Sequence, residues 1–509
     1  MLRTKTIALW FAFLFAFQKV SIGQFYDRTW VIGAIPMVTL TFNSDTTVLG
    51  SFYGNTPMNF TDEASSNVSD TNGSLLFFCN GSVIADSTTN VMMGGDTLLD
   101  SLFFSIYAGG FVEPQTNIIL PRSGNTFYVF YFSESDSLYG SNTIDEPDRL
   151  YYAVVDMNQN GWRGKVISKK NVAYKGLFGQ CRITACRHAN GRDWWLVHQG
   201  FQNDEYFTYL VTPDSVHAPR IQHIGPSNFY ADNPGSQSAF SPDGSKFATS
   251  TSYGPLLIMD FDRCTGIFSN PDSMPVLNST YTYNGQSEGV AFGAPGCCFS
   301  PNSRFVYITN TYDIWQYDTW ATNIANSATL VGQWDTVGPP GAFKAFYQLS
   351  LLPNGKIIID NFNGSSSAFH LIDSPDVQGQ GCHFMFNGLP TSTINAASLP
   401  NMINYRLGPL IGSGCDTVTG INDLLGKAFT AQMYPNPGSD VIQVDIANRN
   451  LSEQISFVLY DMLGHEVLRR NIPLYQIQVS RDGIASGLYH WQVQNVSGEV
   501  RAKGKMVWE

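Results

Sequence analysis

Histidine is the side chain that most often moves protons in enzymes, so its spacing is the first test for a catalytic site. The eight histidines are His188, His198, His217, His223, His370, His383, His465 and His490. None of them forms an HExxH motif or an i, i+4 pair suited to a metal ion. The sequence also has no GxSxG elbow, Walker loop or GxGxxG fingerprint after a strand. It therefore predicts no catalytic, cofactor-binding or metal-binding residues and favours a non-enzyme.

One segment is similar to the start of a calcium-binding loop. Residues 156–161 read Asp-Met-Asn-Gln-Asn-Gly, with oxygen-bearing side chains at positions 1, 3 and 5 and glycine at position 6. The twelfth position is Ile167, where such loops use a bidentate Glu. The segment also falls where the repeats described below have a second hairpin turn. We interpret it as a turn, with calcium as the open alternative and no other cofactor expected.

The strand-like stretch WWLVH, residues 194–198, holds three side chains with possible binding roles. Successive side chains of a strand point to opposite faces, so one of Trp194 and Trp195 is expected to face outward. An outward indole could stack on a sugar ring. We expect His198, at the end of the stretch, to be a hydrogen-bonded structural residue.

The composition favours strands and excludes one class of partner. Charged residues make up 14% of the 509 residues and aromatic residues another 14%, whereas about 25% charged residues is typical of globular domains. Aromatic and β-branched side chains fit a pleated surface. The net charge is −12 and the basic residues are not clustered, so nucleic acid is not an expected partner.

The N-terminus has the pattern of an export signal. Arg3 and Lys5 precede the apolar run Ile7–Phe17, and Ser21-Ile22-Gly23 supplies small residues before Gln24. The apolar run is too short for a comfortable membrane span. We predict a signal peptide over residues 1–23, cleaved between Gly23 and Gln24, and no transmembrane segment.

Cysteine usage leaves two interpretations open. The eight cysteines are Cys79, Cys181, Cys186, Cys264, Cys297, Cys298, Cys382 and Cys415. An even number in an exported chain permits disulfides, and Cys181 with Cys186 or Cys382 with Cys415 could pair. Buried free thiols are the alternative. The spacing does not support a zinc site.

One turn-and-strand pattern recurs along the chain. FSPDGSKFATS at residues 240–250 is repeated as FSPNSRFVYIT from Phe299 and LLPNGKIIID from Leu351, and weaker copies lie upstream. The turns fall near residues 73, 124, 191, 244, 303 and 355, a period of about 50 to 60 residues that indicates a repeat architecture. Pro, Asp, Asn and Gly suit such turns.

The repeats predict an all-β fold, namely a seven-bladed β-propeller. Strands such as FYVFYF are apolar throughout, which is typical of strands covered on both faces. About seven units fit between residues 24 and 410. We expect the last unit to draw strands from His383–Leu407 and from Trp30–Phe42, so that the first and last segments pair and close the ring.

Two segments resemble a propeller group found in surface and gliding-associated proteins of Bacteroidota. Met58–Asp86 looks like the opening blade of that group, and Ser398–Leu407 looks like its closing segment. The resemblance covers most of residues 28–410. It implies the fold, and it says little about function because propellers host many activities.

The composition changes after residue 430. Residues 411–430 lack strand signals and read as a linker, whereas residues 431–509 contain short alternating strands and predict a small antiparallel β-sandwich. This tail resembles the type A C-terminal sorting domain of the type IX secretion system. The residues that carry the resemblance are Tyr434, Pro435, Asn436, Pro437, Tyr460, Asp461, Gly464, Gly487, Leu488, Tyr489, Gly504 and Lys505.

The resemblance of the tail implies partners and a destination. It implies export across the outer membrane by the type IX secretion machinery, removal of the tail, and attachment to surface lipopolysaccharide. We therefore predict a secreted or cell-surface propeller that acts as a binding, adhesion or structural module with a glycan or protein ligand. The alternative is a secreted hydrolase or lyase acting on polysaccharides or esters at the mouth of the propeller channel.

Overall fold

The computed structural model describes most of the chain after residue 25. The described residues are 26–33, 36–43, 47–53, 64–70, 72–107, 110, 113–136, 147–179, 182–201, 203–226, 236–250, 255–275, 277, 281–283, 286–288, 296–310, 312–334, 345–362, 367–391, 399–415, 430–447, 454–472, 476–481, 483–496, 498 and 500–509. The chain forms two compact units, residues 1–418 and 419–509, and each is considered by itself below. The predicted signal peptide, with Gly23 and Gln24, lies outside the described residues.

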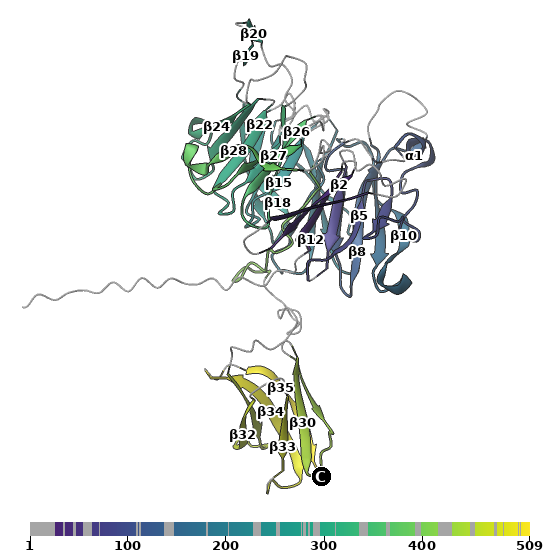
Figure 1. Cartoon of the computed structure of the whole chain (residues 1–509), viewed down its shortest axis with the longest axis vertical. Coiled ribbons are helices and arrows are strands. Elements are labelled where there is room, and N and C mark those ends of the chain that lie inside the picture. Colours follow the sequence, from purple (N-terminus) through teal and green to yellow (C-terminus); the bar gives the residue numbers. More distant parts are fainter. Residues whose placement is uncertain are drawn as a thin grey trace, which may run out of the picture. The chain divides into compact units, whose positions relative to one another are not determined.

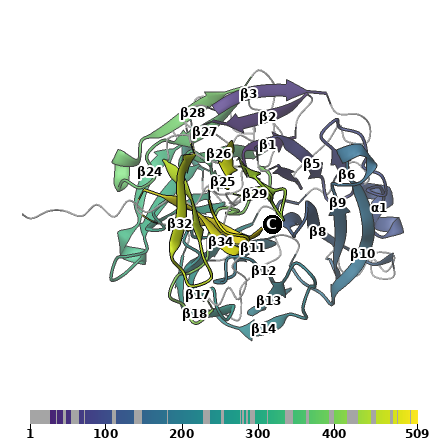
Figure 2. The same cartoon turned by 90° about the horizontal axis from the view of Figure 1, so that it is seen from below.

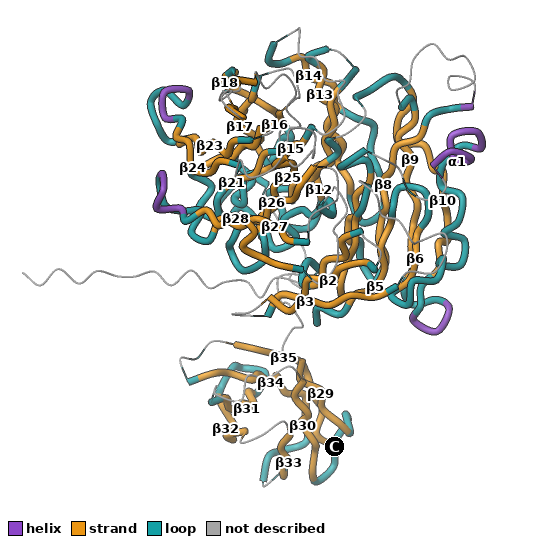
Figure 3. The backbone as a smooth tube through the Cα atoms, turned by 45° about the horizontal axis from the view of Figure 1, so that its top comes forward, coloured by secondary structure: helices purple, strands orange, loops and turns teal. Residues whose placement is uncertain are grey.

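Strands dominate both units (Figure 3), which confirms the all-β prediction. Among the described residues the helical segments are α1 (Ser101–Tyr107), η1 (Asn160–Trp162), η2 (Ala325–Ser327) and η3 (Gly379–Cys382). None of the helices in the described part is long and apolar enough to cross a membrane.

Besides one two-stranded hairpin, the described part of the first unit has seven antiparallel sheets, which follow one another along the chain (Figure 1). Sheet 1 is β1 (Thr29–Ile32), β2 (Met37–Phe42) and β3 (Thr47–Phe52), and sheet 2 is β4 (Ser66–Ser69), β5 (Leu75–Cys79) and β6 (Ile84–Asp86). Sheet 3 is β7 (Asn117–Pro121), β8 (Thr126–Ser133), β9 (Arg149–Asp156) and β10 (Lys165–Lys175). Sheet 4 is β11 (Thr184–Arg187), β12 (Trp194–Gln199), β13 (Glu205–Val211) and β14 (Arg220–His223).

The remaining three sheets of the first unit also have four strands each. Sheet 5 is β15 (Gln237–Phe240), β16 (Lys246–Ser250), β17 (Leu256–Asp262) and β18 (Ile267–Met274). Sheet 6 is β21 (Cys297–Phe299), β22 (Phe305–Asn310), β23 (Asp313–Asp318) and β24 (Thr329–Gln333). Sheet 7 is β25 (Ala345–Leu351), β26 (Ile357–Phe362), β27 (Ala368–Ile372) and β28 (Phe384–Pro390). A separate hairpin, β19 (Tyr281–Tyr283) and β20 (Gln286–Glu288), lies between sheets 5 and 6 in the sequence.

Buried apolar clusters join each sheet to two neighbours. Sheets 1 and 2 share one cluster, sheets 2, 3 and 4 share another, and further clusters join sheet 4 to 5, 5 to 6 and 6 to 7. A last cluster joins sheet 7 to sheet 1 and includes Phe369 and Trp30. The sheets therefore close into a ring (Figure 2), a seven-bladed β-propeller in which the first and last blades cover each other's apolar faces.

Burial on both faces explains the apolar strands. In β8, the seven residues Phe127–Ser133 are all buried, because the strand lies within a ring of sheets packed face to face. The first strands of neighbouring sheets contact one another, so these strands line the central channel.

The recurring turn lies between the first and second strands of sheets 2 to 7. Each turn places one residue in the left-handed region, with φ between 64° and 91°: Gly73, Gly124, Gly191, Gly244, Ser303 and Gly355. At Gly244 a Cβ atom would lie 2.7 Å from the Sγ of Cys186, so packing as well as conformation requires glycine. These are the six positions at which the sequence predicts turns. The face of the propeller that carries them is called the turn face below.

The closure of the ring differs from the prediction. Residues 30–42 do not pair with the last sheet but form sheet 1, which packs on sheet 7. Phe384–Pro390 is a strand, β28, as expected. Residues 399–410, all of them described, form no strand. We call this segment the closing strap. Its polar side chains bind the inner strands, and these bonds hold it across the channel.

The second unit is a two-layer β-sandwich. One sheet has the order β29 (Thr430–Tyr434), β30 (Val441–Ala447), β33 (Gln476–Ser480), and the other has the order β32 (Glu466–Ile472), β31 (Ile455–Tyr460), β34 (Gly487–Asn495), β35 (Val500–Trp508). Inward side chains of both sheets, including Val444, Phe457 and Trp491, form one buried cluster. The predicted sandwich is confirmed.

Candidate functional site

The closing strap enters the channel at Asn401. Its backbone nitrogen donates a hydrogen bond to the oxygen of Ser65 at 2.7 Å. Its side-chain nitrogen donates to the backbone oxygens of Asn117 and Ile183, both at 2.9 Å. One residue therefore joins the inner edges of sheets 2, 3 and 4, and the buried backbone oxygens have partners there.

Two glutamine side chains also bind backbone groups at the inner ends of the sheets. Gln115 donates to the oxygen of Ser238 at 3.0 Å and accepts from its nitrogen at 2.9 Å, which links the approach to sheet 3 with sheet 5. Gln237 donates to the oxygen of Leu349 at 2.7 Å and accepts from the nitrogen of Cys297 at 3.0 Å, which links sheets 5, 6 and 7. The two carboxamides thus connect the inner strands of sheets 5, 6 and 7 and the approach to sheet 3.

The second half of the strap is held by Tyr405 and Arg406. The hydroxyl of Tyr405 donates to the oxygen of Ile119 at 2.9 Å. The guanidinium of Arg406 lies 2.8 Å from the carboxylate of Asp27. These contacts connect the end of the propeller sequence to its beginning and to sheet 3.

A cavity of about 270 Å³ lies between the strap and the inner strands of sheets 4 to 7. Its lining combines apolar side chains, backbone and neutral polar groups, and the turns of sheets 5 to 7 form part of its rim. The residues that characterise it are Trp30, Gln115, Gln237, Phe240, Phe299, Ser350, Leu351, Met402 and Asn404, with Pro242, Pro301 and Pro353 at the turns. We call this cavity the turn-face pocket.

Two of the described lining residues are charged, and they bind each other. Asp27 and Arg406 form the ion pair described above. Burial raises the pKa of Asp27, and the nearby guanidinium offsets only part of that effect. A lining of amides, hydroxyls, backbone and apolar groups is suited to binding an uncharged ligand.

The cysteines lie in the propeller, and their pairing corrects the prediction. Cys264 and Cys415 form a disulfide and Cys382 is a free thiol, so the possible pairing of Cys382 with Cys415 is wrong. Cys186 is a buried free thiol, in line with the alternative interpretation, so it does not pair with Cys181, which lies outside the described residues. The disulfide joins the chain just after the strap to the turn that follows β17.

The free thiols are unreactive by position. Cys79, Cys186, Cys297, Cys298 and Cys382 are all buried. Burial raises the pKa of Cys79, Cys186 and Cys297 to about 12 and also raises that of the other two. The thiolate is the nucleophilic form, and a raised pKa keeps these thiols protonated at neutral pH. They are therefore unreactive and pack as small apolar residues.

His198 and His370 are structural. The Nε2 atom of His198 lies 2.9 Å from the hydroxyl of Tyr209, and that of His370 lies 2.8 Å from the Oδ1 of Asn361. Burial lowers the pKa of both imidazoles to about 3. Both are therefore neutral, and neither faces the turn-face pocket.

The segment similar to a calcium loop is a hydrogen-bonded turn between β9 and β10. Asp156 accepts hydrogen bonds from the backbone and side-chain nitrogens of Asn158, at 2.9 and 2.8 Å, and from Gln159 at 3.1 Å. These nitrogens surround the carboxylate where a cation would need oxygens. No group of three His, Cys, Asp or Glu side chains within the described residues is placed to hold a metal ion.

The prediction that Trp194 or Trp195 faces outward is wrong. Trp194 and Trp195 are both buried, because sheet 4 is covered on both faces. Trp162 and Trp320 are exposed instead, at 69% and 65%. Each lies in the turn between the third and fourth strands of its sheet. In the sequence, Trp162 and Trp320 differ from the buried Trp194 and Trp195 only because they lie outside the apolar strand-like runs.

The residues of the tail motif occupy turns and strand contacts in the second unit. The side chain of Asn436 accepts from the nitrogen of Val507 at 3.0 Å and donates to the oxygen of Lys505 at 3.1 Å. Asp461 accepts from the nitrogens of Leu463 and His465 in the turn that contains Gly464.

The later motif residues lie on β34 and β35. Tyr489 is buried and donates to the oxygen of Ala485 at 2.7 Å, and Gly504 packs beneath the ring of Trp491. Gly487 and Leu488 begin β34, opposite Trp508 and Val507 of β35. The remaining motif residues are Tyr434, at the end of β29, Pro435 and Pro437, which follow it, Tyr460, at the end of β31, and Lys505, on β35.

Sequence reasoning missed the residues that build the pocket. Asp27, Gln115, Gln237 and Arg406 come from segments far apart in the sequence. The available signal was the polar spacing in LPNMINYR, residues 399–406, where Asn and Arg interrupt an apolar run after the last strand.

Residues 432–507 match the Secretion system C-terminal sorting domain family. No curated protein matches the chain by sequence.

Among solved structures, the chain is similar to PorZ, an essential bacterial surface component of the type IX secretion system of Porphyromonas gingivalis. The identity is 12%, the TM-score is 0.34, and the match covers 93% of this chain and 63% of PorZ, so the chain spans less than two thirds of that protein. It is also similar to the periplasmic gluconolactonase PpgL of Pseudomonas aeruginosa, with 10% identity, a TM-score of 0.35 and coverage of 89% and 99%. The propeller domain of Cps50 (Swd1) from Myceliophteria thermophila matches with 10% identity, a TM-score of 0.34 and coverage of 66% and 90%.

The seven sheets and their packing, not these distant likenesses, define the fold of the first unit. The match to residues 432–507 defines the second unit as a sorting domain of the type IX secretion system. The chain is therefore a propeller protein that the type IX machinery exports, either secreted or held at the cell surface.

Proposed function

We propose that this protein is an exported binding module whose propeller holds a small uncharged ligand, or one end of a larger ligand, in the turn-face pocket. The observation that carries the proposal is the pocket itself, a cavity at the channel mouth with apolar walls and neutral hydrogen-bonding groups. Pockets of this kind bind ligands by apolar contact and use a few polar groups for orientation.

The size and charge of the pocket limit its ligand. A volume of about 270 Å³ is at the low end of ligand sites and suits one or two rings or a short peptide end. Its two charged residues neutralise each other, so neither a free carboxylate nor an ammonium group of the ligand finds an unpaired countercharge. The ligand is therefore expected to be polar and uncharged.

The proposed ligand site is tested by a ligand screen and by a substitution that fills the pocket with a larger side chain. Ser350, on β25, lines the pocket. Ser245, in the turn between β15 and β16, is exposed and does not line it. We expect a thermal-shift screen with oligosaccharides, lactones and short capped peptides to find at least one ligand that raises the melting temperature. The substitution Ser350→Phe should abolish that shift, whereas Ser245→Phe should keep it. If no compound stabilises the protein, or if Ser350→Phe responds as the parent does, the pocket is not a ligand site.

The sorting motif and the domain limits complete the proposal. We propose a signal peptide over residues 1–23, a propeller over 24–410, a linker over 411–430 and a sorting domain over 431–509. We further propose that the source is a member of the Bacteroidota, that the tail is removed after export, and that the mature protein attaches to surface lipopolysaccharide. The resemblance of the motif residues Tyr434–Pro437 and Tyr460–Gly464 to type A sorting domains supports this.

Export is tested by deletion of residues 431–509. The truncated protein should accumulate in the periplasm, and the full chain should reach the surface or the medium. A matched variant that lacks only the β19–β20 hairpin should still be exported. Finding the truncated form outside the cell would contradict the assigned role of the tail.

A further inference from the structure

We infer that Trp320, on the turn between β23 and β24, is a contact for a neutral saccharide. The inference is independent of the turn-face pocket. It starts from a repeated feature: in sheets 5, 6 and 7, a basic residue at the start of the second strand binds an Asp at the end of the third strand. The pairs are Lys246–Asp260, Arg304–Asp318 and Lys356–Asp373.

Sheet 6 differs from its neighbours because its basic residue is Arg304. The guanidinium binds the carboxylate of Asp318 through two nitrogens, at 3.0 and 2.6 Å. Its central carbon lies 4.8 Å from the ring centroid of Phe305 and 5.3 Å from that of Trp320. Phe305 is buried and Trp320 is 65% exposed. A planar cation thus stacks between a core ring and a surface indole, an arrangement that Lys cannot form.

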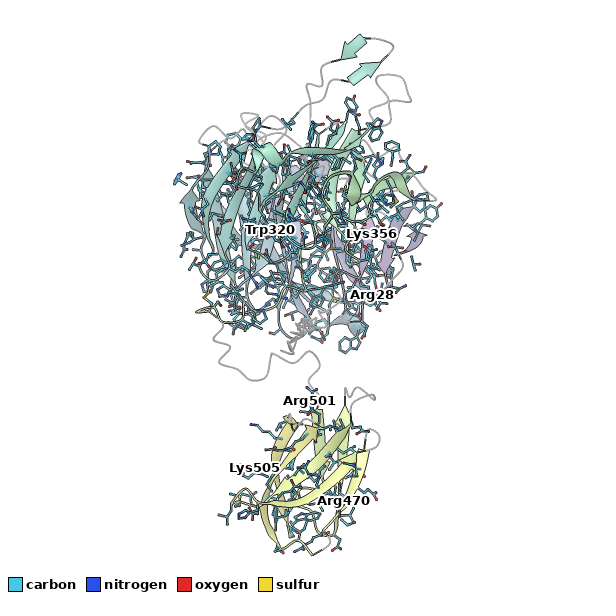
Figure 4. The ribbon with its side chains drawn as sticks, turned by 90° about the vertical axis from the view of Figure 1, so that its left-hand side faces the viewer. Arg28, Trp320, Lys356, Arg470, Arg501 and Lys505 are labelled. Carbon is cyan, nitrogen blue, oxygen red and sulfur yellow. A yellow bond between two sulfur atoms is a disulfide. The ribbon has the colours of Figure 1, made fainter. Side chains whose placement is uncertain are left out.

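The stack holds the indole in place before any ligand binds. The backbone nitrogen of Trp320 donates to the Oδ1 of Asp318 at 3.0 Å, and Asp318 is fixed by Arg304. One face of the indole meets the cation and much of its remaining surface meets solvent. Figure 4 labels Trp320 on the first unit. Preorganised aromatic surfaces bind with little loss of conformational entropy.

The surroundings of Trp320 favour a sugar over a protein. Among the described residues between 296 and 334, Trp320 is the large apolar side chain that is exposed. A stable protein interface buries about 800 Å² on each partner around an apolar centre, and one indole supplies at most about 250 Å². A single aromatic plane amid polar groups instead matches the C–H face of a pyranose ring.

The polar groups near Trp320 are neutral. Residues 319–328 read Thr-Trp-Ala-Thr-Asn-Ile-Ala-Asn-Ser-Ala and contain no charge, and the side chains of Thr322, Asn323 and Asn326 belong to exposed residues. Asn and Thr offer both donors and acceptors to sugar hydroxyls. Arg304 is neutralised by Asp318 and the whole chain carries −12, so an anionic polysaccharide would be repelled.

Trp162 provides a matched control. It is similarly exposed and lies in the corresponding turn of sheet 3. The neighbouring Arg163, however, binds Asp86 at 3.0 Å and Thr88 at 2.7 Å. Substitution of Trp162 therefore removes an exposed indole from the same face of the propeller without removing the stack on Arg304.

The test is affinity electrophoresis of residues 24–509 in gels that contain hydroxyethylcellulose, xylan, galactomannan, laminarin or dextran. We expect at least one polysaccharide to retard the protein. Trp320→Ala should weaken that retardation at least about tenfold and Trp162→Ala less than twofold. Arg304→Lys, which keeps the charge but not the stack, should fall between them. Retardation by none of the gels, or equal effects of Trp320→Ala and Trp162→Ala, would overturn the inference.

Two further variants keep the result interpretable. Trp320→Phe keeps a ring over Arg304 and should fold as the parent does, with affinity about threefold to tenfold lower. A Trp320→Phe protein with unchanged affinity would contradict the role of the indole. Ser350→Phe, which fills the turn-face pocket, should leave retardation unchanged, so that failure of the pocket and failure of the Trp320 contact are told apart.

Discussion

The side-chain nitrogen of Asn401 donates a hydrogen bond to the backbone oxygen of Asn117 at 2.9 Å, across 284 positions of sequence. The same nitrogen also binds the oxygen of Ile183. Asn401 is buried, so both hydrogen bonds are made away from solvent. One amide in the closing strap thus completes the hydrogen bonding of two inner strands.

Removal of this amide should destabilise the propeller. We expect Asn401→Ala to lower the free energy of unfolding by about 2 to 4 kcal/mol, because two buried backbone oxygens lose their donor. Asn404→Ala is the control, since Asn404 is exposed and its side-chain nitrogen makes one bond, to the oxygen of Pro242. It should cost less than about 1 kcal/mol. Urea unfolding of both variants measures the difference, and equal effects would argue against a central role of the strap.

The number of cysteines that react with an alkylating agent should rise when the protein is unfolded and rise again when it is also reduced. Cys181→Ser is used as the background, because Cys181 lies outside the described residues. Of the seven remaining cysteines, five are buried thiols and two form the Cys264–Cys415 disulfide. Mass spectrometry after alkylation should find no adduct on the folded protein, five on the unfolded protein and seven after reduction as well. Rapid labelling of the folded protein would contradict the burial of the thiols.

Stability should fall as the pH drops below about 6.5. Burial lowers the pKa of His198 and His370 to about 3 in the folded state, against 6.5 for an ordinary imidazole. Between these values the unfolded chain binds more protons than the folded chain, so stability is present above pH 6.5 and is lost as the pH falls. From pH 7.5 to pH 5 each histidine should cost about 2 kcal/mol.

This pH effect is measured by urea unfolding at pH 7.5, 6.5 and 5. The carboxylates with lowered pKa contribute mainly at lower pH, so the chosen window reports on histidine. Replacement of His198 and His370 together by Gln should flatten the pH dependence. Burial lowers the pKa of His188 as well, which adds a slope of the same sign, whereas the hydrogen bond to Asp204 raises the pKa of His223, which contributes a slope of the opposite sign.

Gly504 of the sorting domain should not accept a side chain. A Cβ atom there would lie 2.6 Å from the ring of Trp491, which is buried in the core of the sandwich. We expect Gly504→Ala to destabilise the second unit by about 1 to 3 kcal/mol through overpacking. Hydrogen exchange of the β34 and β35 amides in the full chain measures it, with exposed Lys503→Ala as the control. Unchanged exchange in Gly504→Ala would show that Trp491 moves aside freely.

The repeating turns could be predicted from the sequence because their cause is local. Pro242, Asp243 and Gly244 specify a turn within a few residues, and Ser303 takes the same left-handed position as Gly244 without being glycine. Continuous apolar strands likewise follow from burial on both faces. The all-β fold and six of the blades therefore follow from patterns that each segment carries by itself. The seventh blade, sheet 1, lacks the turn pattern and is predicted only from the length of the chain.

The pocket and the disulfide could not be predicted in the same way. Asn401 meets Asn117, and Cys264 meets Cys415, only after the sheets have closed into a ring. The expected outward position of Trp194 or Trp195 failed for a related reason, since alternation in a strand says nothing about a second covered face. Contacts across the ring depend on the whole fold, and single segments do not encode them.

The packing of sheet 7 on sheet 1 sets the order in which the propeller can mature. A ribosome supplies sheet 1 first, yet its outer apolar flank stays bare until the last blade has emerged. Contacts so distant in sequence form slowly. The ring can therefore close only after the last blade has been made, because the apolar face of sheet 1 that packs on sheet 7 has no cover before then.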